Sequence, residues 1–484
     1  MGIDYLFPHF EVLRDDSRCI RCKLCLKQCP NGVYSIDDAS GNWQIREQAC
    51  VNCQRCAAFC PADALKIIPA RCSFRGNAAW DSDTIRQIYI QASTGGVLLG
   101  SCGNPHMEPD YFSHLALYGA QATTVPIDPL REPPSIITRI GGAEGLTLKT
   151  PFLFAAMSFG SLSFPAQEAM ATAAKVLDTC WNCGEGGWHP KLLPMEDHTI
   201  VQVASGRFGI SAEVLRRAAA IEIKLGQGGK PGIGGHLPAE KVTEEVAALR
   251  KIPAGTDAIS PAPHHDIHCM EDLRQLITVL KEITNYRKPI MVKIAAVHNT
   301  AQIACAIARC GADILCIDGT HGGTGAAPIH FRDHVGIPLP LALSAADQAL
   351  RQEGLRQNIS LIAGGSIRSA ADAAKAIALG ADACYIGTAA LLALGCRLCR
   401  SCQKGRCAWG IATQEPQLFS RLDSNVGQQR LVNLIHSWNH GLVELLGGMG
   451  LSSLDSLRGN RQMLRGVGLH DAELKVLGVL HAGA

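Results

Sequence analysis

The stretch "ISLIAGGSIRSAADAAKAIALGADACYIGTA" (359–389) contains the pattern that decides the fold. Two short apolar runs, 359–365 and 383–389, flank an amphipathic segment rich in alanine. Continuous apolar runs of this length are typical of parallel strands buried on both faces, and the segment between them has the helical period. The stretch therefore predicts a strand–helix–strand unit of an α/β protein.

The same alternation of apolar and amphipathic segments continues through the middle of the chain. We count eight apolar runs, at 151–157, 199–205, 220–226, 257–261, 289–295, 313–319, 359–365 and 383–389. Eight strand–helix alternations over about 250 residues predict a (β/α)8 TIM barrel rather than an open doubly wound sheet. Catalytic groups are then expected in the loops at the C-terminal ends of the strands.

The glycine-rich loops after the last two predicted strands indicate a phosphate site. In a TIM barrel these loops commonly bind phosphate through free backbone N–H groups. The residues that supply them here are Gly364, Gly365, Ser366, Gly387 and Thr388. Glycine also simply closes turns, but two such loops at the right strands favour a cofactor that carries a phosphate.

The N-terminal part of the chain carries two matched cysteine runs. "CIRCKLCLKQCP" (19–30) and "CVNCQRCAAFCP" (50–61) both have the C-x2-C-x2-C-x3-C-P spacing of bacterial two-cluster ferredoxins, in which each fourth cysteine binds the other cluster. One [4Fe–4S] cluster is therefore predicted on Cys19, Cys22, Cys25 and Cys60, and a second on Cys50, Cys53, Cys56 and Cys29. A pair of zinc knuckles is the alternative, which two matched runs ending in proline disfavour. Because such clusters transfer single electrons and most carbon substrates accept two, we expect a flavin between them, and FMN has the single phosphate that suits the barrel.

Composition excludes several classes of function. Of the 484 residues 18% are charged, and the net charge of +2 argues against a nucleic-acid partner. No span approaches the roughly 20 apolar residues of a membrane helix, and the N-terminus lacks the apolar core of a signal peptide. The 21 cysteines stand largely in metal-ligand spacings within a large chain, which favours reduced thiolates. We expect a cytoplasmic protein without membrane insertion.

The motifs of the predicted barrel resemble those of a known family. The synthase domain of glutamate synthases has similar stretches in the same order: "MSFGSLS" (157–163), "GEGG" (184–187), "SGRFG" (205–209), "KLGQGGKPGIGGHLP" (224–238), "ISPAPHHDI" (259–267), "DGTHGGTGAAP" (318–328) and "GTAALLALGCRLCRSCQKGRCAWGIATQ" (387–414). With the ferredoxin-like unit in front, the chain resembles most the FMN-binding glutamate synthase family of archaeal type.

This resemblance implies a third cluster. The family's synthase domain holds a [3Fe–4S] cluster beside the flavin on three cysteines separated by six and then five positions. Cys396, Cys402 and Cys407 have this spacing. Cys399 is an additional thiol, so a [4Fe–4S] cluster stays open as an alternative, and zinc is disfavoured by the matching flank "GIATQ". Cys72 and Cys102 fit no pattern and are predicted to be buried structural thiols.

The reaction that the resemblance implies is reductive amination of 2-oxoglutarate to L-glutamate by reduced FMN, with ammonia as the nitrogen source. The implied substrate-site residues are Glu185, Lys224, Gln227 and Arg250, of which the cations suit carboxylates. Besides the five phosphate-loop residues, the implied FMN-binding residues are Met157, Ser158, Gly160, Arg207, Lys293, Gly322 and Gly323. Lys293 is expected beside the flavin N1–C2 carbonyl, where a cation stabilises the reduced anionic ring.

The chain is expected to divide into four parts. These are a two-[4Fe–4S] ferredoxin-like domain (1–70), a connector (71–135) with a helix at 82–93, the FMN-binding barrel (136–415) with the cluster motif 396–407, and a C-terminal helical segment (416–484). We expect no glutaminase domain in front of the ferredoxin-like part, so ammonia is expected from a separate glutaminase subunit or from solution. Ferredoxin or a reductase subunit is the expected electron donor.

Two related functions stay open. An N-methylglutamate synthase-type subunit shares this domain and differs in the amine, and an electron-relay subunit would pass electrons through the flavin without catalysis. A hydroxy-acid oxidase uses a similar barrel but has no need of twelve cysteines in cluster spacing.

Overall fold

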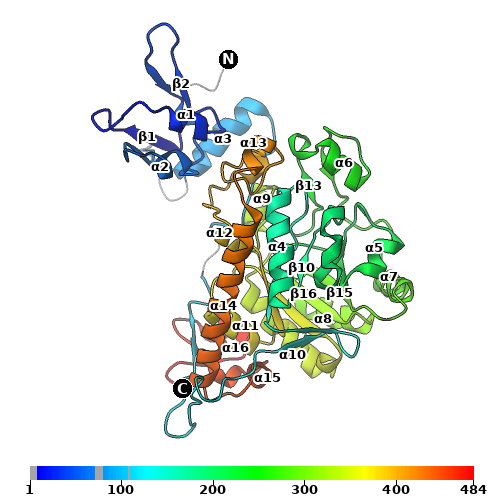
Figure 1. Cartoon of the computed structure of the whole chain (residues 1–484). Helices are drawn as coiled ribbons and strands as arrows, with labels where there is room; N and C mark the ends of the chain where they lie inside the picture. Colours follow the sequence, from blue (N-terminus) through cyan, green and yellow to red (C-terminus); the bar gives the residue numbers. More distant parts are fainter. Residues whose placement is uncertain (1–7, 71–79, 107–108) are drawn as a thin grey trace.

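A closed barrel of eight parallel strands forms the centre of the computed structural model, which describes residues 8–70, 80–106 and 109–484 (Figure 1). Around the barrel the strands are β9 (Phe152–Phe154), β10 (Trp181–Asn182), β11 (Thr199–Val203), β12 (Ala220–Lys224), β15 (Ile290–Ala295), β16 (Ile314–Asp318), β18 (Ser360–Gly364) and β19 (Ala383–Ile386). β19 pairs back with β9 in parallel, which closes the barrel. The predicted TIM barrel is confirmed.

One of the eight predicted strands is wrong. The run 257–261 forms the short β14 (Ala258–Ile259), which pairs antiparallel with β13 (His236–Leu237) outside the barrel, and Ile259 is 59% exposed. The barrel instead gains β10, which lies between β9 and β11 and is only two residues long, and β12 pairs directly with β15. A strand of two residues, one of which is a buried asparagine, has no apolar run, so the sequence pattern does not reveal it.

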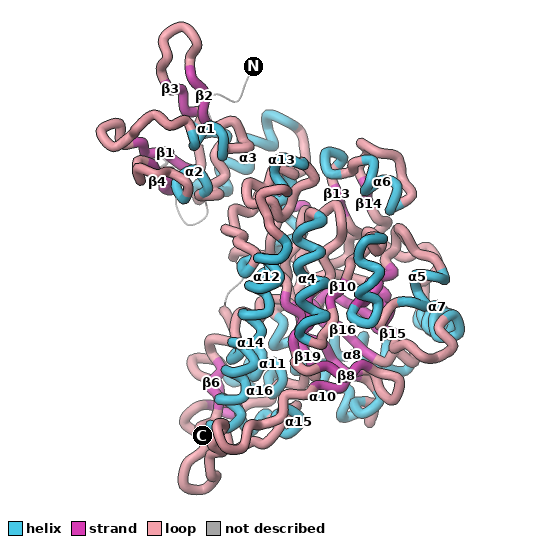
Figure 2. The backbone as a smooth tube through the Cα atoms, viewed as in Figure 1, coloured by secondary structure: helices cyan, strands magenta, loops and turns pink. Residues whose placement is uncertain are grey.

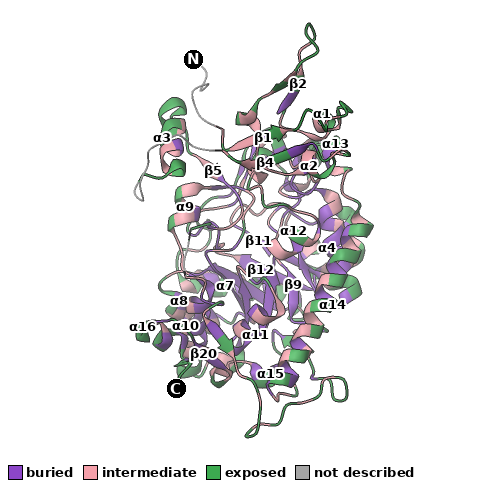
Figure 3. Cartoon of the chain, turned by 90° about the vertical axis from the view of Figure 1, so that its left-hand side faces the viewer, coloured by how far each residue is buried: buried purple, intermediate pink, exposed green. Residues whose placement is uncertain are grey.

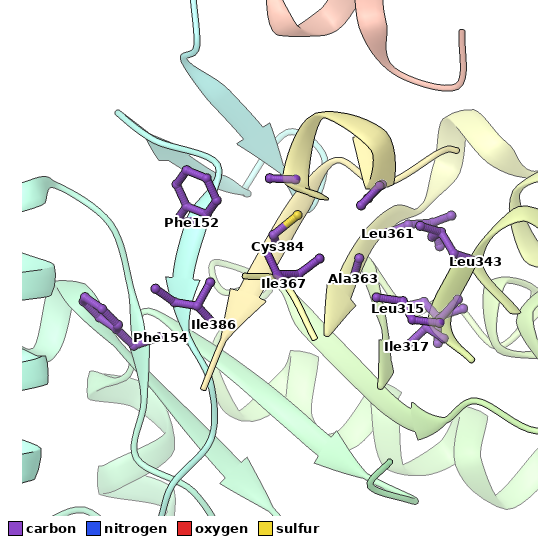
Figure 4. Packing of buried hydrophobic residues seen from close by; sticks show 14 of the residues in the cluster. Phe152, Phe154, Leu315, Ile317, Leu343, Leu361, Ala363, Ile367, Cys384 and Ile386 are labelled. Atoms are coloured by element: carbon purple, nitrogen blue, oxygen red, sulfur yellow. The ribbon is translucent and has the colours of Figure 1, made fainter. Parts of the chain in front are cut away.

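The barrel strands place alternate side chains in two different environments. In β16, Leu315 and Ile317 pack outward among the helices, whereas Cys316 packs inside the barrel, as the two-residue period of a strand requires. Figure 4 shows Leu315 and Leu361 beside Leu343 of the helix α10 (Leu339–Gln352). The strands are almost entirely buried (Figure 3).

Helices surround the strands (Figure 2). The outer helices besides α10 are α4 (Phe164–Leu177), α5 (Ala212–Arg217), α7 (Met270–Ile283), α8 (Thr300–Arg309), α11 (Ala370–Ala378) and α12 (Thr388–Ala393). α11 follows the sequence signals closely: the Ser369 side chain accepts a hydrogen bond from the Asp372 backbone N–H and caps the helix, and the alanines that follow are buried. In the described part of the chain, no helix is long and apolar enough to cross a membrane.

The N-terminal unit is a small body of its own at one end of the barrel (Figure 1). It contains β1 (Phe10–Arg14), α1 (Leu24–Gln28), β2 (Tyr34–Ile36), β3 (Trp43–Ile45), α2 (Arg55–Ala58) and β4 (Leu65–Pro69). β1 pairs antiparallel with β4, and the core between them includes Val12 and Ile67. The connector then forms α3 (Ser82–Thr94), which confirms the helix predicted at 82–93, and β5 (Leu99–Gly100).

Further short elements cover the two ends of the barrel. On the side of its mouth lie α6 (Glu244–Arg250), β17 (Ala327–Pro328), α9 (Ile329–His334) and α13 (Pro416–Phe419). β5 pairs antiparallel with β17, so the connector is attached to the loops that follow the strands. At the other end a hairpin is formed by β7 (Thr138–Ile140) and β8 (Leu146–Leu148).

The C-terminal segment packs on the outside of the barrel. Its elements are α14 (Ser424–Gly448), α15 (Leu454–Leu457), β20 (Leu464–Gly466), α16 (Asp471–Leu477) and β21 (Leu480–His481), and α14 lies along α4 and α11. β20 also pairs with β6 (Leu115–Leu117) of the connector.

Asp347 of α10 joins this segment to the barrel. Its carboxylate is fully buried and forms ion pairs of 2.8 Å with Arg351, 2.8 Å with Arg356 and 2.9 Å with Arg461 of the C-terminal segment. A buried carboxylate shared by three guanidinium groups holds the segment in one position.

We predict that Asp347→Ala lowers the free energy of unfolding by about 3–5 kcal/mol, because it leaves the nearly buried guanidinium of Arg461 without its counter-charge. Urea unfolding followed by circular dichroism measures the change. The control is Glu353→Ala, which breaks a half-exposed pair with Arg309 and should cost about 0–1 kcal/mol. Equal losses in the two variants would contradict the role of Asp347.

Candidate functional site

The cysteines of the N-terminal unit form two groups that exchange one member. A groove is lined by Cys19, Cys22, Cys25 and Cys60. Cys29, by contrast, lies beside the thiols of the second run, where it contributes to the electrostatic environment of Cys50, Cys53 and Cys56. The fold thus brings together the two crossed sets that the spacing predicts.

Both cysteine runs have the same unusual backbone. Arg21 and Lys23 in the first run, and Asn52 and Gln54 in the second, have φ values of 54°, 60°, 53° and 60°. Left-handed residues alternating with ordinary ones turn successive N–H groups toward one concave side, which suits an anionic group. Tyr34 Oη also donates to Cys56 Sγ over 3.1 Å. Thiols surrounded by such donors fit [4Fe–4S] clusters.

The side chains are not arranged for a single ion. Among the described residues, no three His, Cys, Asp or Glu side chains converge closely enough to hold one metal ion. Zinc needs its ligands at about 2.0–2.3 Å from one centre.

A cavity of about 530 Å³ opens at the C-terminal ends of the barrel strands. Its size is within the range of about 300–1,000 Å³ typical of ligand sites. The residues predicted to bind FMN that line it are Met157, Ser158, Lys293, Gly322, Gly323, Gly364, Gly365, Ser366, Gly387 and Thr388. The phosphate loops and the other barrel loops therefore share one cavity.

Two residues of the predicted FMN set lie elsewhere. Gly160, at φ +95°, packs against Val246 and Leu237, and a Cβ there would approach Leu237 to 2.8 Å. Arg207 forms an ion pair of 2.6 Å with Asp266 away from the cavity. Both residues hold their loops in shape and neither lines the cavity.

Glycine is required where the loops of the cavity meet. Gly365 has φ +101°, and a Cβ there would come within 2.9 Å of the Gly319 backbone. At Gly323 a Cβ would lie 3.2 Å from Thr388 Oγ1. These glycines leave space at the predicted phosphate end of the cavity, and larger residues would fill it. The space fits the phosphate group of FMN.

Lys293 provides a buried cation at the base of the cavity. Its Nζ lies 3.3 Å from Asp318 Oδ2 and 5.8 Å from the centre of the Tyr385 ring. Burial lowers the pKa of Lys293, but Asp318 and Glu222 outweigh it, so the pKa is raised above its ordinary value. The ammonium group is thus available to stabilise a reduced anionic flavin.

Two lysines and a carboxylate form another wall of the cavity. Glu185 Oε2 lies 3.2 Å from Lys224 Nζ, and both side chains are nearly buried. Burial would raise the pKa of Glu185, but Lys224 and Lys230 outweigh it and lower the pKa to about 2. Gly235 lies directly against the Glu185 carboxylate and has no room for a side chain. Glu185 is therefore ionised.

Lys230 is a site residue that sequence reasoning missed. It is 3% exposed, lines the cavity and donates from Nζ to the Ala326 carbonyl over 3.1 Å. Burial, and then the neighbouring Lys224, lower the pKa of Lys230 to about 8. Its signal was a lysine inside the glycine-rich loop that follows β12.

The two remaining residues predicted for the substrate site have different positions. Gln227 lines the cavity and donates from Nε2 to the Gly323 carbonyl over 3.0 Å. Arg250, at the end of α6, does not line it. Its guanidinium is buried and donates to Ser158 Oγ over 3.2 Å and to the Phe159 carbonyl over 3.0 Å. Arg250 thus supports the loop after β9 from behind.

The late cysteines line the same cavity as the glycine loops. Cys396, Cys399, Cys402 and Cys407 all contribute to its wall. Cys102 lies there too, and its thiol forms a hydrogen bond with the Cys402 side chain. The prediction that Cys102 is a buried structural thiol is wrong, because the connector carries it to the barrel mouth; Cys72 lies outside the described residues.

The N-terminal unit contacts the barrel next to these cysteines. Trp409 Nε1 donates to the Cys53 carbonyl over 2.9 Å, and the Arg55 guanidinium lies 4.9 Å from the Trp409 ring. Cys53 itself lines the cavity, whereas Cys22 is exposed on the far group. Figure 3 shows the unit at the end of the barrel near α12 and α13. The group with Cys53 is therefore the inner one.

Comparison with known proteins agrees with this architecture. Residues 110–452 match the conserved region in glutamate synthase, and residues 18–64 match the 4Fe-4S dicluster domain. The archaeal glutamate synthase (NADPH) of Methanocaldococcus jannaschii is 51% identical over 508 residues, which cover 99% of both chains. The archaeal-type glutamate synthase (NADPH) of Thermotoga maritima is 50% identical over 497 residues, 98% of both chains. Whole-chain similarity at this level, together with both domain matches, places the chain in the archaeal-type glutamate synthase family.

Proposed function

We propose that the cavity at the barrel mouth binds FMN and 2-oxoglutarate side by side, and that the chain makes L-glutamate there by reductive amination. The observation that carries this proposal is that four sets of residues line the same cavity. They are the phosphate loops, Lys293, the pair Lys224 and Lys230, and the late cysteines. Family membership makes the chain an iron–sulfur flavoprotein glutamate synthase subunit.

Bound FMN supplies the hydride and converts between single-electron and two-electron transfer. Gly364, Gly365, Gly387 and Thr388 would hold its phosphate end. Lys293 would face the ring, because it is the buried cation between β12 and β16 and its partner Asp318 keeps it in place. The crossed cysteine sets would hold two [4Fe–4S] clusters, and Cys396, Cys402 and Cys407 the third.

The substrate wall has the charges that a dicarboxylate needs. Lys224 and Lys230 offer two ammonium groups, and Gln227 adds an amide beside them. Glu185 is ionised between the lysines, where it orients Lys224 and can accept a hydrogen bond from ammonium. Near-complete burial of Lys224 and Glu185 strengthens these interactions relative to water.

The electrons are proposed to enter at the outer cluster. Its ligand Cys22 is exposed, and the inner set with Cys53 adjoins the barrel through Trp409. Ferredoxin or a reductase subunit would be the donor, and the names of the two archaeal-type relatives include NADPH. Ammonia would come from a separate glutaminase subunit or from solution.

The test is glutamate formation by the cluster-loaded, FMN-loaded protein, reduced with dithionite and given 2-oxoglutarate and ammonium. We predict that Lys224→Met lowers kcat/KM for 2-oxoglutarate by about 10- to 150-fold, because a charge-assisted contact of about 1.5–3 kcal/mol is lost. The matched control Lys149→Met, at a lysine 75% exposed on the far side, should leave it unchanged.

Three outcomes separate the alternatives. Absence of glutamate at high ammonium overturns the assignment. Preference for methylamine would make the chain an N-methylglutamate synthase-type subunit. A flavin spectrum that 2-oxoglutarate does not perturb would leave only electron relay.

The pH dependence gives an independent prediction. The ammonium of Lys230 loses its proton as the pH rises through about 8, so kcat/KM for 2-oxoglutarate should fall above this pH. Lys230→Met should lower kcat/KM below pH 8 and abolish the inflection, whereas Lys230→Arg should keep the charge and move the inflection upward. An inflection near 8 that persists in Lys230→Met would show that another group causes it.

A further inference from the structure

One of the late cysteines, Cys402, has surroundings that the other three lack. Lys241 Nζ donates to the Cys402 carbonyl over 3.4 Å and to the Ser161 carbonyl over 2.7 Å. The Cys402 backbone N–H donates to Ser101 Oγ over 3.2 Å. The Cys102 thiol forms a hydrogen bond with the Cys402 side chain. Three polar groups from two distant parts of the chain therefore meet around Cys402, two of them at its backbone and one at its thiol.

Lys241 is a buried cation whose charged neighbours are unusual. It is 2% exposed and ends the short 3₁₀ helix Ala239–Lys241. The titratable groups that face it are the thiols of Cys402 and Cys407 and the guanidinium of Arg250. An isolated buried ammonium is costly. A negatively charged cluster on these thiols would provide the counter-charge that Lys241 otherwise lacks.

The connector holds Cys102 against Cys402 in a constrained backbone. Cys102 has φ +64°, a conformation that a non-glycine residue seldom adopts. Its N–H donates to the Thr324 carbonyl over 2.8 Å, and the adjacent Gly103 packs directly on the His321 backbone. On the other side, Gln403 Nε2 donates to the Leu99 carbonyl over 3.2 Å. The segment 99–103 is thus fixed both to the barrel loop and to the cysteine loop.

We propose that Lys241, Ser101 and Cys102 act on Cys402 to raise the reduction potential of the third cluster. The inference rests on the proposed function in that Cys402 is a ligand of this cluster. Reduction adds one negative charge to the cluster, and a nearby cation or a hydrogen bond to a ligating sulfur stabilises the more negative state. In the water-poor interior the ammonium of Lys241 acts with little screening.

This arrangement gives the third cluster a function beyond conduction. A raised potential makes it the preferred position for an electron that arrives from the two ferredoxin-like clusters. The electron is then held next to the flavin site rather than at the exposed end around Cys22. Cys102 acts in this proposal as a donor to a ligand and not as a ligand itself.

The proposal is tested by potentiometric titration of the intact, cluster-loaded protein, followed by low-temperature electron paramagnetic resonance of the third cluster. Lys241→Met should lower the reduced-to-oxidised ratio at the wild-type midpoint at least tenfold, a shift of about 59 mV for one electron. Lys404→Met is the matched control: it removes the same charge two residues after Cys402, but from an exposed side chain, and should change the ratio less than twofold. Signals of the other two clusters should not move.

Two further variants keep the test decisive if Lys241→Met fails to load its cluster. Cys102→Ala and Ser101→Ala should each lower the ratio about two- to fivefold, with iron and sulfide content unchanged. The proposal is overturned if Lys241→Met shifts no more than Lys404→Met, if neither connector variant shifts the midpoint, or if Cys102→Ala changes the number of irons, which would make Cys102 a ligand.

These measurements need no turnover, so they separate the inference from the proposed function. Shifted midpoints in a protein that makes no glutamate would support the inference and refute the function. A wild-type protein without a third cluster signal would refute the assignment of Cys402 on which both depend.

Discussion

The carboxyl group of Glu222 connects strands from opposite sides of the barrel interior, and the cavity is built on top of this contact. Asn182 of β10 and Gln202 of β11 donate to Glu222 Oε1 over 2.9 Å and 2.6 Å, and Tyr385 of β19 donates to Oε2 over 3.1 Å. The carboxyl group is fully buried, so each donor offsets part of a large desolvation cost. β10 has only two residues, and the hydrogen bond from Asn182 to Glu222 connects it to β12 inside the barrel. Glu222 also contributes to the negative charge around Lys293, the buried cation at the base of the cavity.

The second constraint is the contact between the N-terminal unit and the barrel. Arg421 donates to the carbonyls of Lys27 and Gln28 at the end of α1 and, on the barrel side, to the carbonyl of Ala408. A cation there meets the partial negative charge of the helix C-terminus. The Arg55 guanidinium lies over the adjacent rings of Phe59 and Trp409, at 4.5 Å and 4.9 Å from their centres. These contacts from both sides hold the inner cysteines at a set distance from the cavity. Electron transfer between separate cofactors requires such a fixed distance.

Sequence reasoning predicted the parts of the molecule that repeat a local pattern. The apolar strand runs and the glycine-rich loops after β18 and β19 are patterns of a few consecutive residues. The crossed cysteine sets follow from a known spacing. The errors have a common physical origin. Arg250 carries the charge that a carboxylate needs, but the face of α6 on which it lies is set by packing, and that face points to the loop after β9. Lys230, Lys241 and Cys102 went unrecognised because each acts on a residue far away in the sequence. The strand β10 was missed because its two residues, Trp181 and Asn182, form no apolar run of their own.

The loop 318–328 is the physical link between the two halves of the cavity. Gly323 accepts the hydrogen bond from Gln227 on the substrate side, and the next residue, Thr324, accepts the one from Cys102 on the cluster side. The loop is held from both directions by glycines that leave no room for a side chain, since Gly228 packs on Gly319 and Gly103 packs on His321. The proposed substrate wall and the proposed cluster wall are therefore both attached to two adjacent residues of this loop. The connector thus reaches the mouth of the barrel and contacts this loop although it contributes no strand to the barrel.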